Sequence, residues 1–237
     1  TEPYTFTYTI NGGSNQTVST TAGSSVTVSV PTGTAGTFTY ALVSVRDASS
    51  TSCIQLQSGS AVVTINPLPT ATIGGTVAVC KDAASPNITF TGASGTAPYT
   101  FTYTLNSGSH QTVTTTSGNS VTVAVPTGTA GIFTYALVSV RDGSLTACSQ
   151  IQGGSATVTV NPLPTATILG TTSVCRNGAS PNITFTGSSG TAPYTFIYTI
   201  NGGSNQTVST TTGSSVTVSV PTGTAGTFTY SLVSVRD

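Results

Sequence analysis

The chain has 237 residues, of which only 4% are charged, and its five acidic and five basic side chains give a formal net charge of zero. Soluble domains ordinarily carry about 25% charged residues, so this balance is unusual. Because there is no basic excess, we expect no electrostatic binding to nucleic acid or to an anionic membrane surface. No run of about 18 apolar residues occurs, so no membrane-spanning helix is predicted and no membrane insertion is expected.

The sequence repeats itself with a long period. The stretch Gly131–Asp142 recurs with small changes as Gly36–Asp47 and Gly226–Asp237, and the copies begin 95 residues apart, at positions 36, 131 and 226. A period of this length indicates tandem domains, each long enough for a small hydrophobic core. We therefore divide the chain into the C-terminal part of one repeat (1–67), a complete repeat (68–162) and the N-terminal part of the next (163–237). Since both ends fall within a repeat, we expect a longer array.

Within the complete repeat, apolar and polar residues alternate at strand spacing, and no segment shows helical spacing over a useful length. In residues 99–105, for example, Tyr99, Phe101 and Tyr103 share one face and threonines the other. The first strand is expected to break at Gly74-Gly75. The even spacing of strands and turns predicts an all-β sandwich. The predicted strands span 70–73 with 77–79, then 87–91, 99–105, 111–115, 121–125, 131–142 and 155–160.

The longest predicted strand contains a change of phase. Phe133, Tyr135 and Leu137 alternate correctly, but the next apolar residues, Val138 and Val140, have the opposite parity. Either a β-bulge inserts one residue after Leu137, or the strand is central and covered on both faces. We favour the bulge, because a sandwich covers only one face of each sheet.

The boundary between repeats is short and rich in proline. Asn66-Pro67-Leu68-Pro69 recurs as Asn161-Pro162-Leu163-Pro164. Two prolines around one leucine hold the backbone extended and remove two hydrogen-bond donors, which indicates a stiff joint and not a flexible linker. We therefore expect successive repeats to lie end to end.

Four cysteines follow the period, Cys53 with Cys148 and Cys80 with Cys175. One cysteine of each type per repeat favours disulfides in a chain that works outside the reducing cytosol. The pairing that we predict is Cys80–Cys148, within the complete repeat, which leaves Cys53 and Cys175 to pair with chain outside residues 1–237. This bond requires the Cys148 segment to fold back, because the two positions belong to opposite ends of a simple sandwich. The alternatives are Cys53–Cys80 with Cys148–Cys175, across the joints, and free thiols.

No other residues suggest chemistry. His110 is the only histidine, and its counterparts are Asn15 and Asn205, so we interpret it as a surface substitution. The complete repeat has two acidic residues, Asp82 and Asp142, too few for a calcium site or a carboxylate pair. No general base accompanies the many Ser and Thr hydroxyls. We therefore predict no catalytic, metal-binding or cofactor-binding residues, and no enzyme. Asp142 beside Arg141 is expected to end a strand or to form a local ion pair.

Three motifs of the complete repeat, residues 98–103, 131–142 and 155–162, resemble known sequences. They are similar to the tandem PKD-like, immunoglobulin-like repeats of giant cell-surface adhesins of Bacteroidota, and especially to those of SprB-type gliding adhesins. The resemblance covers the whole chain. It implies immunoglobulin-like β-sandwich repeats, export across the outer membrane by the type IX secretion system and display at the cell surface. It also implies partners outside this chain, namely the secretion and gliding machinery.

The first functional hypothesis is thus a structural stalk in an adhesin filament that takes part in surface attachment and gliding motility, with neighbouring repeats as its direct partners. Its support within the sequence is the near identity of residues 4–47 and 194–237, the stiff joints and the scarcity of lysine and arginine. A second hypothesis is a binding module whose Thr-rich face contacts extracellular polysaccharide or an abiotic surface with avidity. A third is a subunit of an assembled extracellular filament or sheath.

Overall fold

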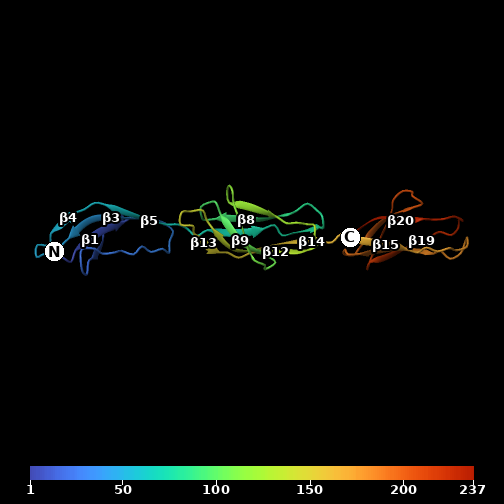
Figure 1. The fold of residues 1–237 in the computed structure, drawn as a ribbon, viewed down its shortest axis with the longest axis horizontal. Coiled ribbons are helices and arrows are strands. Elements are labelled where there is room, and N and C mark those ends of the chain that lie inside the picture. Colours follow the sequence, from blue (N-terminus) through green and yellow to red (C-terminus); the bar gives the residue numbers. More distant parts are fainter.

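A computed structural model describes residues 1–237 and shows three β-sheet units in a row (Figure 1). Unit 1 (1–67), unit 2 (68–162) and unit 3 (163–237) lie end to end along the long axis, and every hydrogen-bonded sheet is made of strands from one unit. All twenty elements are strands. No helix that could cross a membrane is found. The all-β fold and the end-to-end arrangement are confirmed.

Unit 2 is a two-sheet sandwich. The larger sheet has the order β10-β9-β12-β14-β7, with the short β13 also paired to β12, and the smaller sheet has the order β11-β8-β6. The strands are β6 (Thr70–Gly74), β7 (Val77–Cys80), β8 (Asn87–Ala93), β9 (Thr100–Leu105), β10 (His110–Thr114), β11 (Ser120–Ala124), β12 (Gly131–Arg141), β13 (Ser149–Ile151) and β14 (Ser155–Asn161).

The first strand is broken as predicted, and its two halves, β6 and β7, belong to different sheets. β6 pairs with β8 in the smaller sheet, whereas β7 runs parallel to β14 in the larger one. The chain crosses between the sheets at Gly75, whose φ is +114°. A Cβ atom at this position would also collide with the Asn87 carbonyl oxygen. Only glycine therefore fits the crossing.

The phase change in the longest strand is a β-bulge, as predicted. The pairing of β12 with β9 shifts between Leu137 and Ser139, so Val138 is the extra residue. The same shift occurs in units 1 and 3. After the bulge Val140 returns to the interior, where it is fully buried. The bulge thus lets both halves of one long strand contribute side chains to the same core.

The core of unit 2 is built around aromatic residues from both sheets. Phe90 in β8 packs on Phe101 and Tyr103 in β9, with ring centroids 5.7 and 5.0 Å apart. Both phenylalanines are completely buried. Such pairs contribute about 0.5–1.5 kcal/mol beyond simple burial. Inward-facing residues of β14 close the core, as the alternating pattern predicts, and they are Ala156, Val158 and Val160.

Units 1 and 3 form most of the strands that correspond to those of unit 2. Residues 25–29 and 172–175, the counterparts of β11 and β7, are not strands. Unit 1 forms one sheet, β2-β1-β3-β4 with β5 also on β3, and unit 3 forms two three-stranded sheets, β15-β16-β19 and β18-β17-β20. These strands are β1 (Thr5–Ile10), β2 (Gln16–Ser19), β3 (Gly36–Arg46), β4 (Ile54–Leu56), β5 (Ser60–Ile65), β15 (Thr165–Leu169), β16 (Asn182–Ser188), β17 (Thr195–Ile200), β18 (Gln206–Ser209), β19 (Ser215–Ser219) and β20 (Tyr230–Arg236).

Candidate functional site at the joint between units

The joint between units 1 and 2 is the most organised polar region of the molecule. We call the end of unit 2 that faces unit 1 its N pole, and the end that faces unit 3 its C pole. Pro69 is fully buried at the N pole. A Cβ atom on Gly95 would lie 3.1 Å from the Pro69 Cβ and 2.9 Å from the Asp142 Cβ, so glycine is required for this approach. The last residue of the joint, Pro69, is therefore packed into the N pole of unit 2, whereas Pro67 and Leu68 are exposed.

Asp142 is the centre of the N pole and is only 5% exposed. Its Oδ1 accepts hydrogen bonds from the Ser144 hydroxyl at 2.8 Å and the Ser144 N–H at 3.3 Å. Its Oδ2 accepts one from the Thr96 N–H at 3.2 Å. The backbone N–H of Asp142 donates to the Cys148 carbonyl at 2.9 Å. Asp142 thus ties the end of β12 to the two loops beside it, and no ion pair with Arg141 is formed.

This network changes the acidity of the carboxyl group. Burial by itself raises the pKa of Asp142, but the hydrogen bonds from Ser144 and Thr96 stabilise the charged form more strongly. The result is a pKa below the ordinary value of 3.8. In unit 1, hydrogen bonding by Ser49 lowers the pKa of Asp47 in the same way, against a small opposing effect of burial. The N pole is consequently built for a permanently charged aspartate at neutral pH.

One side-chain hydrogen bond crosses the joint. The Asn66 amide nitrogen of unit 1 donates to the Thr146 hydroxyl of unit 2 at 2.7 Å. The same Thr146 oxygen lies 3.3 Å from the Cys148 sulfur. The joint motif includes Asn66, but the sequence patterns assigned no role to its side chain and did not point to Thr146. The available signal was periodicity, because Asn66 recurs as Asn161 and Thr146 has the counterpart Thr51.

The four cysteines are all free. Cys148 lies at the N pole of unit 2, hydrogen-bonded to Asp142, whereas Cys80 lies at the C pole, where it is the strand partner of Asn161. β12, with 11 residues, runs from one pole to the other, which corresponds to about 35 Å. Disulfides need Cα atoms within about 7 Å. The predicted Cys80–Cys148 bond is therefore not formed, because the Cys148 segment does not fold back.

The cross-joint alternatives are no closer. Cys53 lies at the far end of unit 1, where its carbonyl accepts the Asp47 N–H, and Cys80 lies at the far end of unit 2. Cys148 and Cys175 are likewise at the outer ends of two consecutive units. Two unit lengths separate the members of each pair. A pairing of Cys53 and Cys175 with chain outside residues 1–237 stays a prediction.

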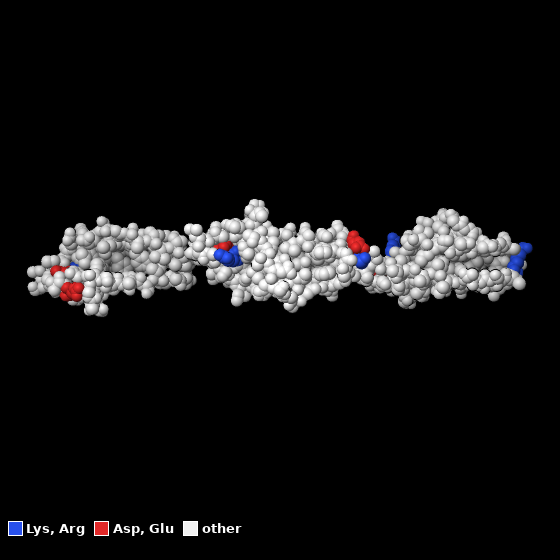
Figure 2. All heavy atoms as spheres, viewed as in Figure 1, with Lys and Arg blue, Asp and Glu red and all other residues white.

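The remaining polar residues form no candidate metal or catalytic centre. His110 begins β10 on the surface, opposite Thr104. No group of three His, Cys, Asp or Glu residues is arranged to hold a metal ion. Lys81 and Asp82 form an exposed ion pair at 3.1 Å. On the face shown in Figure 2, charged side chains occur in small groups near the ends of the units, and the sides between them are uncharged.

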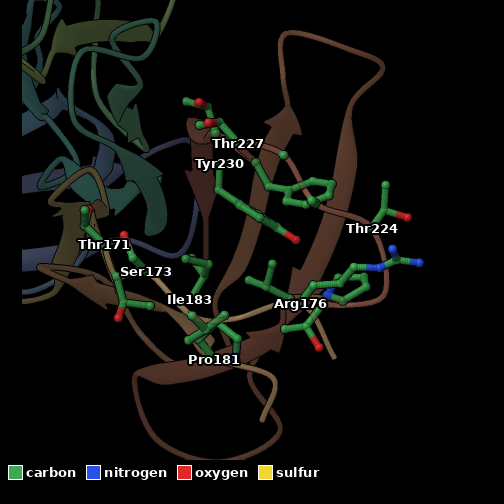
Figure 3. Close-up of a pocket in the computed structure, with 18 of the residues that line it drawn as sticks. Thr171, Ser173, Arg176, Pro181, Ile183, Thr224, Thr227 and Tyr230 are labelled. Atoms are coloured by element: carbon green, nitrogen blue, oxygen red, sulfur yellow. The ribbon is translucent and has the colours of Figure 1, made fainter. Parts of the chain in front are cut away.

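A pocket in unit 3 is an uncovered part of a sandwich core. Figure 3 shows Ile183 and Tyr230 directed into it, with Arg176 at its edge. The counterparts of these two core residues in unit 2, Ile88 and Tyr135, are buried. In unit 2 the corresponding space lies against β14, and residues 163–237 contain no counterpart of that strand. A second pocket in unit 1 exposes apolar residues in the same manner, where counterparts of β6 and β8 are missing. We assign no ligand to either.

Comparisons with known proteins found only distant similarity. No family model matches the sequence, and no curated protein matches it. Among solved structures, a 1.5-MDa bacterial ice-binding adhesin is similar with 15% identity and a TM-score of 0.40, over 94% of this chain and 76% of the other. A tetra-tandem repeat in the extending region of a large adhesion protein gives 18% identity and a TM-score of 0.34, over 92% and 58% of the two chains. These values are low, so the fold assignment rests on the strand pairing itself.

Proposed function

We propose that this chain is a section of the stalk of a long cell-surface adhesin, with the task of extending and stiffening a filament. The observation that supports this proposal best is the joint. Pro69 is buried within unit 2 directly after the boundary, Asn66 bonds across the boundary, and the units follow one another in a straight row (Figure 1). Buried proline and a side-chain bond both restrict bending, as a stalk requires.

The distribution of charge supports the same role. Charged residues are few, and they gather near the ends of the units, so trypsin-like proteases meet few accessible cleavage sites along the sides. Location at the cell surface, export by the type IX secretion system and a part in gliding motility belong to this proposal. They are supported by the resemblance of the three repeat motifs to SprB-type adhesin repeats.

Small-angle X-ray scattering of the chain tests the stalk proposal. A straight row of three units, each about 35–45 Å long, predicts a radius of gyration of roughly 35 Å, against about 18 Å for a compact chain of this size. A radius of gyration near the compact value would reject the stalk.

Gold-labelled antibodies against the chain, applied to intact cells of the source organism, test the location. Labelled filaments on the outside are expected, and labels that travel along gliding cells would support the motility role.

A second candidate is a surface-binding module, favoured by the outer face of the larger sheet of unit 2. Thr100 and Thr102 on β9 lie opposite Thr114 and Thr112 on β10, and Thr157 lies outside on β14. Some of these hydroxyls bond to one another, as Thr100 does to Thr114 at 3.0 Å. The result is an uncharged hydroxyl array of the kind that could meet polysaccharide. Column retention on immobilised polysaccharide that increases with repeat number, and decreases for Thr102→Val with Thr112→Val, would favour this function.

A further inference from the structure

Each pole of unit 2 carries one cysteine, Cys148 at the N pole and Cys80 at the C pole. At the N pole of unit 2, the Cys148 sulfur is 3.3 Å from the Thr146 hydroxyl. That hydroxyl accepts the hydrogen bond from Asn66 of unit 1 at 2.7 Å. Asn66 therefore marks the exact place where the end of one unit meets the cysteine loop of the next.

The counterpart of Asn66 in unit 2 is Asn161, and its neighbour is a cysteine. β14 and β7 run parallel, and their last pair is Asn161 with Cys80. Paired residues in adjacent strands are about 4.8 Å apart and point to the same face of the sheet. Here that is the outer face, because the residues before them, Val160 and Val79, are directed to the core. Cys80 is exposed.

The contact of Asn66 with the Cys148 loop shows the N-pole side of a joint, and the pairing of Asn161 with Cys80 shows the C-pole side. In any pair of complete consecutive units, the Cys80 position of the first lies beside the asparagine that contacts the Cys148 loop of the second. We propose that a disulfide joins Cys80 of each unit to the counterpart of Cys148 in the unit that follows. In residues 1–237 no such pair is complete, since unit 1 has no counterpart of Cys80 and unit 3 has none of Cys148.

Formation of this bond is an ordinary thiol–disulfide exchange. Each bond formed releases two protons and two electrons from two thiols. The electrons pass to the disulfide of a small-molecule or protein oxidant of the thiol–disulfide class, which is reduced to two thiols. One cysteine thiolate first forms a mixed disulfide with the oxidant, and the second thiolate then displaces the oxidant's remaining sulfur. An oxidising exterior supplies such conditions.

The proposed bond would change how an array carries load, a consequence that rests on the stalk function. Tension would follow the shortest covalent path between poles. That path spans 11 residue-to-residue steps from Pro69 to Cys80, or 13 from Cys148 to Asn161. Such segments extend to at most about 36–47 Å, close to the length of a folded unit. An array linked in this way could not lengthen appreciably, even if a sandwich unfolded.

The test uses the full chain extended after Asp237 by a copy of residues 143–162, which completes unit 3 and adds a fifth cysteine. The protein is equilibrated with oxidised and reduced glutathione, and peptides are mapped by mass spectrometry without reduction. We expect a linked peptide pair that contains Cys80 and the added cysteine, and three free thiols. A Cys80–Cys148 peptide pair, or five free thiols in a chain with intact β-structure, would overturn the proposal.

Matched serine variants separate the possible pairings. Cys80→Ser in the extended chain should abolish the linked peptide, whereas Cys148→Ser and Cys175→Ser should leave it unchanged. The within-unit alternative predicts instead that Cys80→Ser and Cys148→Ser both abolish a bond. Because Cys80 and Cys175 are exposed, these variants are expected to fold. Peptide mapping does not depend on the stalk function. Absence of the linked peptide would reject the disulfide, whereas a compact scattering profile would reject the stalk.

Force spectroscopy of the same extended chain gives a second readout. Oxidation should hide from extension the chain between the two bonded cysteines, which spans 163 residue-to-residue steps. The total gain in contour length should thus be about 540–590 Å smaller than under reducing conditions. The Cys80→Ser variant should show the full gain in both conditions. An equal gain for the oxidised and reduced parent chain would contradict the proposed bond.

Discussion

At the scale of single residues, Asp142 shows how one repeated side chain closes the end of a sandwich by hydrogen bonds. It recurs at each copy of the repeat, and its carboxylate bonds to Ser144 and Thr96 while the backbone closes the Cys148 loop. Hydrogen bonds to a charged acceptor contribute more than neutral ones, about 1.5–3 kcal/mol. Because Asp142 is almost fully buried, loss of its charge leaves donors without a proper partner.

Asp142→Asn should therefore lower the free energy of unfolding of unit 2 by about 1.5–3 kcal/mol. The folded-state pKa of Asp142 is lowered, so the stabilisation is present above the ordinary value of 3.8 and is lost as the pH falls through the folded-state value. Hydrogen–deuterium exchange of unit 2 between pH 7 and pH 3 measures both effects, after correction for the intrinsic exchange rate. The variant should show a weaker loss of stability below pH 4 than the parent. The exposed Asp82→Asn serves as control and should change stability by no more than about 0.5 kcal/mol.

Glycine positions provide a second test at this scale. A Cβ atom on Gly92 would lie 2.5 Å from the ring of Tyr99, whereas one on Gly128 would meet nothing within 4 Å. Gly92→Ala should destabilise unit 2 by about 1–3 kcal/mol, because the buried ring has no room to move. Gly128→Ala should be close to neutral. Thermal unfolding followed by circular dichroism compares the two, and equal midpoints would contradict the proposed close packing.

At the scale of elements, the bulge in β12 decides which face each half of the strand presents. Val138 takes the extra position, so Val140 pairs with Phe101 and is fully buried; a regular strand that kept Val138 would turn Val140 to the surface. Val140→Thr should therefore lower the free energy of unfolding by about 1–3 kcal/mol, because it buries a hydroxyl without a partner. Val138→Thr changes the extra residue itself and should cost less than about 1 kcal/mol. Urea denaturation of both variants measures the difference. Equal midpoints would show that the bulge does not direct Val140 into the core.

At the scale of the whole molecule, the arrangement depends on the joints. Pro67 is exposed, so replacing it with glycine, together with Asn66→Ala, should loosen the joint without removing core packing. We expect the radius of gyration to fall and the distribution of distances between units 1 and 2 to broaden, as measured by scattering and by paired spin labels. Ser107→Gly, in the β9–β10 turn away from the joint, is the matched control and should change neither. An unchanged distance distribution in the joint variant would show that neither group limits bending.

The sequence by itself determined the all-β class, the repeat, the bulge and the strand positions of unit 2 apart from β13, and it predicts a stiff joint. These features follow from local chemistry, because alternation sets the buried face, proline restricts the backbone and a change of parity requires an extra residue. Only the tertiary structure decided that β6 and β7 belong to different sheets, and that Cys80 and Cys148 occupy opposite poles. Equal spacing along the chain does not show which pole a loop reaches. That depends on strand direction and sheet order, which come from contacts between residues far apart in sequence.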